Sequence, residues 1–140
     1  MRFVLDYTVS MRWLLRDGVL EDQTYAERVL TSLFTNEAWV PSSWWIDMTN
    51  VISKSEQNNL ISQVESEHFL RLMGPLPINE RLIPGPQLLR TTLDLTRQNG
   101  LSTERAVYLG LAMLENVPLA SSDTQLCGIA NQLGIERYNS

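Results

Sequence analysis

The stretch Arg2-Phe3-Val4-Leu5-Asp6 places three apolar residues directly before an acid. A run of this kind predicts a short strand that is buried on both faces, as in parallel sheets. A second stretch of the same type, Pro118-Leu119-Ala120-Ser121, is followed two residues later by Asp123. The carboxyl ends of parallel strands meet at one edge of a sheet, and ligands bind beyond that edge. We therefore expect Asp6 and Asp123 to lie there together.

Strand and helix patterns alternate along the rest of the chain. Further strands are expected at residues 39–41, 76–78 and, very short, 135–136. Helical spacing of apolar residues predicts helices over residues 9–16, 24–34, 43–53, 62–73, 87–98, 103–114 and 124–133. This alternation predicts one α/β domain over residues 1–140, built as a three-layer α/β/α sandwich around a short parallel sheet.

Composition narrows the class of protein. The chain has 140 residues, of which 44% are hydrophobic and 19% charged, which is typical of a globular domain. Sixteen acidic residues against 11 basic ones give a net charge of −5, which disfavours non-specific nucleic-acid binding but still allows RNA held through metal ions. The sequence has one cysteine, Cys127, and one histidine, His68, which excludes a disulfide framework and a zinc cluster. The lack of a long apolar run or a signal-like segment predicts a cytoplasmic protein without a membrane partner.

The candidate acids also have simpler interpretations. Asp6 and Asp123 each precede an expected helix, so either carboxylate can cap free amide groups at a helix N-terminus. A third acid, Asp47, lies inside the apolar helical stretch Trp44–Ile52, and an acid in such a position is more often simply solvated. These interpretations stay open beside a catalytic one.

Several short motifs, taken in order, carry a resemblance to a known family. They are Phe3-Val4-Leu5-Asp6, Trp13, Val40-Pro41-Ser42-Ser43-Trp44, Asp47, Asn50-Val51-Ile52, Gly100-Leu101-Ser102-Thr103, Ala106-Val107-Tyr108-Leu109 and Val117 to Asp123. Together they cover essentially the whole chain. In this order and spacing the sequence resembles the PIN domain and, within it, the VapC-type ribonuclease toxins of toxin–antitoxin pairs.

The resemblance implies a function and a set of site residues. It implies a pocket that binds Mg²⁺ or Mn²⁺ and hydrolyses RNA phosphodiesters, with an RNA substrate, a homodimer and a small DNA-binding antitoxin as partners. By position, Asp6, Asp47 and Asp123 match catalytic acids, and Asp6 and Asp123 are the expected metal ligands. Asp47 stands where a Glu is more usual. The expected supporting residues are Thr8, Asn50 and Ser121. The adjacent Trp44 and Trp45 cannot both face one side of a helix, which agrees with a dimer contact.

The sequence departs from the family at one position. Arg105 occupies the place of a usual acid, and its neighbour Glu104 points about 100° away around the helix. A cation in the first turn opposes the helix dipole, so we expect Arg105 to pair with Asp6 or Asp123 in the pocket; the other interpretation is that it points outward.

Three functions remain open at this point. The first is a metal-dependent ribonuclease. The second is a catalytically weakened or inactive PIN-fold binding protein. The third is a small phosphatase, because Asp6-Tyr7-Thr8-Val9 faintly resembles the start of the haloacid-dehalogenase phosphatases.

Overall fold

A single parallel sheet forms the centre of the molecule, in a computed structural model that describes residues 1–140. Its strand order is β3-β2-β1-β4, so β1 lies between two neighbours. The strands are β1 (Arg2–Leu5), β2 (Glu37–Val40), β3 (Ile78–Glu80) and β4 (Leu119–Ala120). All three pairings are parallel, as the sequence predicts.

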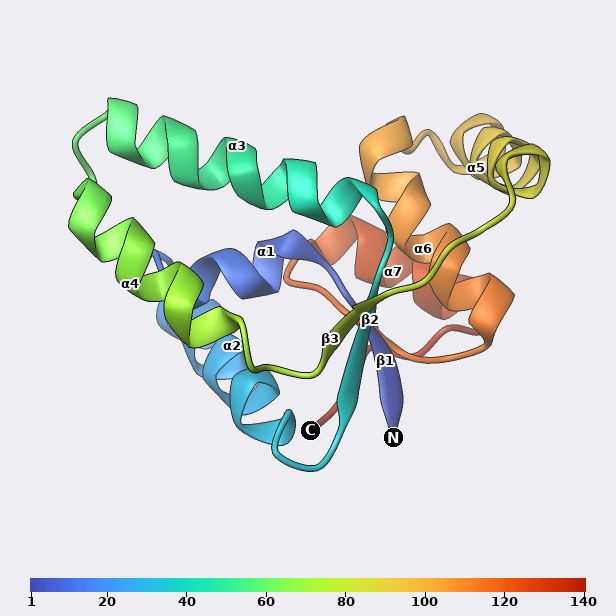
Figure 1. Cartoon of the computed structure of the whole chain (residues 1–140). Helices are drawn as coiled ribbons and strands as arrows, with labels where there is room; N and C mark the ends of the chain where they lie inside the picture. Colours follow the sequence, from blue (N-terminus) through green and yellow to red (C-terminus); the bar gives the residue numbers. More distant parts are fainter.

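Seven α-helices cover the two faces of the sheet. They are α1 (Tyr7–Ser10), α2 (Leu20–Ser32), α3 (Ser43–Gln57), α4 (Gln63–Met73), α5 (Gly85–Asn99), α6 (Thr103–Glu115) and α7 (Thr124–Gln132). Figure 1 shows α1 to α4 on one side of the strands and α5 to α7 on the other. The predicted α/β class and three-layer α/β/α arrangement are therefore confirmed. No helix has both the length and the apolar character that a membrane span requires.

The core is built around β1. Phe3, Val4 and Leu5 are fully buried, because helices cover both faces of the strand and β2 and β4 flank it. The capping residues mark the helix starts: Ser62 and Glu65 form a capping box at α4. Gly100 ends α5 in the left-handed conformation, with φ 66°.

Several boundaries differ from the sequence prediction: α2 covers Leu20–Ser32 rather than residues 24–34, α3 continues to Gln57 rather than residue 53, and β2 covers Glu37–Val40 rather than residues 39–41. The first helix begins at Tyr7, where Asp6 caps it, and becomes a 3-10 turn over Met11–Trp13 instead of continuing to residue 16. Strand β3 starts at Ile78, since Pro77 has no amide hydrogen and contributes only its carbonyl, which accepts from Ala38.

Two further differences concern the start of α5 and the expected strand at residues 135–136. Helix α5 starts at Gly85, because a proline in the first turn sacrifices no hydrogen bond. The predicted strand at residues 135–136 is wrong: one isolated bridge joins Leu119 to Arg137.

Tyr138 closes the core against the first strand. Its ring stacks on Phe3 with centroids 3.8 Å apart, and its side chain is 1% exposed. Its backbone amide donates to Leu119, its carbonyl accepts from the Tyr25 hydroxyl, and its own hydroxyl accepts from Asn36 at 2.6 Å. The C-terminal segment is thus held by both stacking and hydrogen bonds.

We expect Tyr138→Ala to lower the free energy of unfolding by about 3–5 kcal/mol, because it removes a buried aromatic ring. Urea denaturation followed by circular dichroism measures this change. Tyr138→Phe is the matched control: it keeps the stack, loses only the Asn36 hydrogen bond, and should cost about 0.5–1.5 kcal/mol. Equal losses for the two variants would contradict a stabilising role for the stack.

Candidate functional site

The pairing of β1 with β4 brings the two acidic stretches together. Leu5 lies opposite Ala120 in the parallel register, and the Asp6 amide donates to the Ala120 carbonyl at 2.9 Å. Asp6 and Ser121 therefore leave the sheet side by side at its carboxyl end. The sequence predicts this edge, because both stretches are buried strands that run the same way.

Asp6 is a buried carboxylate held by two hydroxyl groups. Its side chain is 3% exposed, and its Oδ2 accepts from Thr8 Oγ1 at 2.8 Å and from Ser121 Oγ at 2.6 Å. Burial raises the pKa of Asp6, the hydroxyl hydrogen bonds act in the opposite direction, and the charge of Asp123 raises it further. Asp6 also accepts from the Thr8 amide at 3.4 Å and caps α1.

The same two hydroxyls order the loop after β4. Thr8 Oγ1 accepts from the Ser122 amide, and Ser121 Oγ accepts from the Asp123 amide, each at 3.0 Å. Each hydroxyl thus donates to Asp6 and accepts from an amide of the loop after β4, so the network joins segments more than a hundred residues apart. Thr8 and Ser121, two of the expected supporting residues, therefore lie beside Asp6.

Arg105 points into the site and pairs with Asp123. Arg105 Nε lies 2.6 Å from Asp123 Oδ2, and a second guanidinium nitrogen lies 2.7 Å from Oδ1, so the pair is bidentate. Arg105 also donates to Gln125 at 3.1 Å. Arg105 therefore does not point outward. Of the two expected acceptors, it contacts Asp123 and not Asp6.

This pair sets the charge state of Asp123. Burial alone raises the pKa of that carboxyl, but hydrogen bonds from Arg105 and from the Leu126 amide, together with the Arg105 charge, lower the pKa below its usual value. Its Oδ1 accepts from Leu126 at 3.1 Å and so caps α7 as well. Asp6 and Asp123 therefore both cap a helix, as the simpler interpretation predicts. In addition, Asp6 accepts from Ser121 and Asp123 pairs with Arg105.

Asp47 lies across Tyr7 from these two acids. Its Oδ2 accepts from the hydroxyl of the buried Tyr108 at 2.6 Å, and burial raises the pKa of Asp47 despite this hydrogen bond. Tyr7, Asp47, Asn50 and Glu104 line an open cleft of about 520 Å³ between α3 and α6. Burial raises the pKa of Tyr7, and the carboxylates of Asp6, Asp47, Glu104 and Asp123 raise it further.

These carboxylates do not fit a shared divalent ion. No three His, Cys, Asp or Glu side chains are grouped so that they could hold a metal ion. Asp6 is bound by two hydroxyls, Asp47 by a tyrosine and Asp123 by an arginine, so each carboxylate already has a partner from the chain. Mg²⁺ is octahedral and usually binds through one or two carboxylates with water in the other positions, so it needs carboxylate oxygens that are not already bound to the chain. Here a guanidinium supplies the positive charge instead.

Sequence reasoning missed Tyr108 and Gln125. The signal for Tyr108 was available: it lies three residues after Arg105 on α6, and residues three apart on a helix are neighbours. Because Tyr108 is uncharged, it could not be told apart from the apolar core residues of the same helix. Gln125 carried no signal, because its contact depends on where α7 begins relative to α6.

No protein-family model matches this sequence, and no curated protein matches it either. The resemblance to PIN domains therefore rests on the sequence motifs alone.

The Arg105–Asp123 pair should make stability depend on pH in a defined direction. A folded-state pKa below the unfolded value of 3.8 contributes stability that is full above pH 3.8 and lost as the pH falls through the folded pKa. Asp123→Asn keeps a good helix cap but removes the ion pair. We expect it to cost about 1–3 kcal/mol at pH 7.

Urea denaturation of both proteins from pH 7 to pH 2.5 measures the difference. The gap between natural protein and Asp123→Asn should narrow below pH 3.8, because both then lack the charged acceptor. Subtracting the two curves removes the part of the Asp6 contribution that comes from burial, but not the part that comes from the Asp123 charge, which Asp123→Asn lacks. A gap that stayed constant with pH would contradict an ionic contribution.

Proposed function

We propose that this chain is a PIN-like protein that has lost metal-dependent RNA hydrolysis and acts by binding another protein. The observation that supports the proposal is the bidentate contact of Arg105 with Asp123, at 2.6 and 2.7 Å, where the resemblance implies a metal ligand. A guanidinium is permanently charged and cannot dissociate as an ion can. The alternative is the metal-dependent ribonuclease that the resemblance implies, which would require Arg105 to leave the site.

Electrostatics favours a protein partner over RNA. The chain carries a net charge of −5, and four carboxylates surround Tyr7. In a metal-dependent nuclease the bound cation reverses the local sign so that phosphate can approach. Arg105 pairs with one of these acids and Lys54 lines the same cleft, so two cations face four acids, and the remaining negative charge disfavours a polyanion.

An exposed face beside the cleft supplies a surface for such a partner. Trp44 is buried and donates to Ser10, whereas Trp45 is 47% exposed and Ile46 63% exposed. Large exposed apolar side chains that lie together are typical of interaction sites. We propose a second copy of this chain as a partner here, in keeping with the homodimer that the resemblance implies; a DNA-binding antitoxin stays a proposal that rests on the resemblance alone.

The first experiment concerns metal and RNA. Natural protein should show no saturable Mn²⁺ binding at millimolar concentrations in calorimetry and no Mn²⁺-dependent cleavage of single-stranded RNA. Arg105→Asp exchanges a positive for a negative charge at the site, so it should raise Mn²⁺ affinity by at least about tenfold. Measurable Mn²⁺-dependent cleavage by natural protein would overturn the loss of catalysis.

Arg90→Asp is the matched control for that variant. It makes the same charge change on α5, where the Arg90 side chain is 71% exposed and makes only a 3.7 Å pair with Asp94. If Arg90→Asp raised Mn²⁺ affinity as much as Arg105→Asp, the effect would come from net charge and not from the site.

A second prediction concerns the oligomeric state. Natural protein should be a dimer by light scattering at micromolar concentration, and Trp45→Glu should shift it toward monomer because it places a charge in the proposed contact. Phe34→Glu is the control, since Phe34 is 91% exposed and lies at the far end of α2. A natural protein that is monomeric at this concentration would remove the dimer proposal but leave the Arg105 result unaffected.

A further inference from the structure

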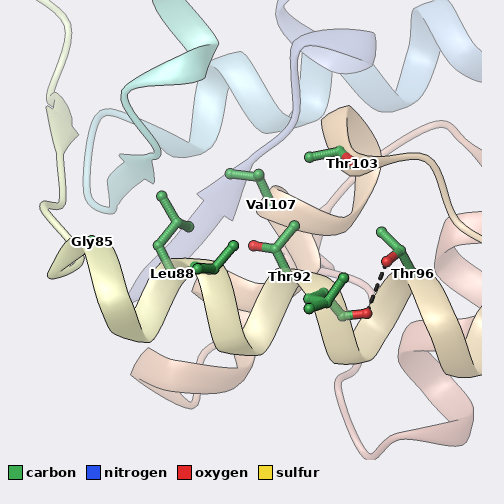
Figure 2. A pocket seen from close by; sticks show the side chains of 8 residues that line it. Gly85, Leu88, Thr92, Thr96, Thr103 and Val107 are labelled. Carbon is green, nitrogen blue, oxygen red and sulfur yellow. Dashed lines mark hydrogen bonds between the residues drawn. The ribbon is translucent and has the colours of Figure 1, made fainter.

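A groove lies between α5 and α6, and none of its lining residues belongs to the acidic cleft. Figure 2 shows Leu88 and Thr92 of α5 directed toward Val107 of α6. The groove has a volume of about 320 Å³ and is also lined by Leu89, Leu93 and Thr96. This volume is within the range of about 300–1,000 Å³ that is usual for small-molecule sites.

The lining of the groove excludes charged ligands. None of the side chains that form it is ionisable, and the apolar ones are leucine and valine. A charged group placed there would lose its hydration without gaining a partner. The surface therefore suits an uncharged ligand with an apolar body.

Thr92 adds a requirement for hydrogen bonding. The residue is 7% exposed, and its Oγ1 is buried without a hydrogen-bond partner in the protein. Thr96, one turn further along the same helix, differs because its Oγ1 donates to the Leu93 carbonyl at 2.8 Å. A buried hydroxyl without a partner destabilises the fold. Thr92 itself lines the groove, so its unpaired hydroxyl lies beside any molecule that binds there.

We propose that the α5–α6 groove binds a small uncharged molecule that has an apolar body and one hydroxyl or carbonyl group, with Thr92 as its hydrogen-bond partner. Leu88, Leu93 and Val107 contact the apolar body. The ligand satisfies the Thr92 hydroxyl that the protein leaves unpaired. The site is separate from Arg105 and Asp123, so the proposal holds or fails independently of the proposed function.

The test uses two probes that differ only in the polar group. Cyclohexanol and methylcyclohexane are titrated into natural protein that carries ¹³C-labelled Leu, Val and Thr methyl groups. Both probes should shift the methyl resonances of Leu88, Leu93 and Val107 saturably. Cyclohexanol should gain about 2- to 10-fold in affinity from the hydroxyl contact, relative to its affinity for Thr92→Val.

Two variants give the discriminating readouts. Thr92→Val keeps the shape but removes the hydroxyl, so it should raise the thermal midpoint of the free protein and reduce affinity for cyclohexanol alone. Thr96→Val is the matched control, because its hydroxyl is already paired, and it should leave the affinity ratio of the two probes unchanged. The methyl spectrum of each variant reports whether it is folded.

Three results would overturn the proposal. One is that neither probe shifts the groove methyls saturably. Another is that Thr92→Val binds cyclohexanol as tightly as natural protein does. The third is that the groove methyls shift with protein concentration rather than with probe, which would show that a second copy of the chain covers this surface.

Discussion

The parallel pairing of β1 with β4 is the constraint on which the site depends. One hydrogen bond, from the Asp6 amide to the Ala120 carbonyl, sets the register at the carboxyl end of the sheet. A slip by one residue would turn every side chain of the strand to the opposite face. Asp6 would then lose Ser121, and Thr8 would lose the Ser122 amide that it binds. The hydroxyl network, the cap of α7 and the position of Asp123 all follow from this register.

Asp123 connects three parts of the molecule with one carboxylate. It caps α7 and accepts hydrogen bonds from two guanidinium nitrogens of Arg105, at the start of α6. Its own amide donates to Ser121 beside β4. A cation in the first turn of a helix costs about 0.3–1 kcal/mol against the helix dipole. The bidentate pair offsets that cost because a charged hydrogen bond in a partly buried place contributes more. Arg105 is therefore compatible with α6 only while Asp123 faces it.

The sequence predicted those parts of the site that depend on strand ends. Asp6 and Asp123 could be placed because a short apolar run precedes each region and both strands run the same way. The direction of Arg105 followed from its unfavourable position at a helix start. The choice of Asp123 over Asp6 did not, since it depends on the angle between α6 and α7. The roles of Tyr108 and Thr92 were not predicted, for a related reason. An uncharged side chain within an apolar helix stripe gives no sign of whether its hydroxyl finds a hydrogen-bond partner.

The contacts of the first strand also govern how the chain folds. Asp6 meets Ser121 across 115 residues, and Phe3 stacks on Tyr138 across an even longer stretch. Contacts between distant parts of a chain slow folding, because the entropy of closing a long loop is lost before the contacts form. During synthesis β1 emerges more than a hundred residues before Ser121 and Tyr138, so it cannot complete either contact until those residues have left the ribosome. A nascent chain must therefore keep this apolar strand protected while the intervening residues are made.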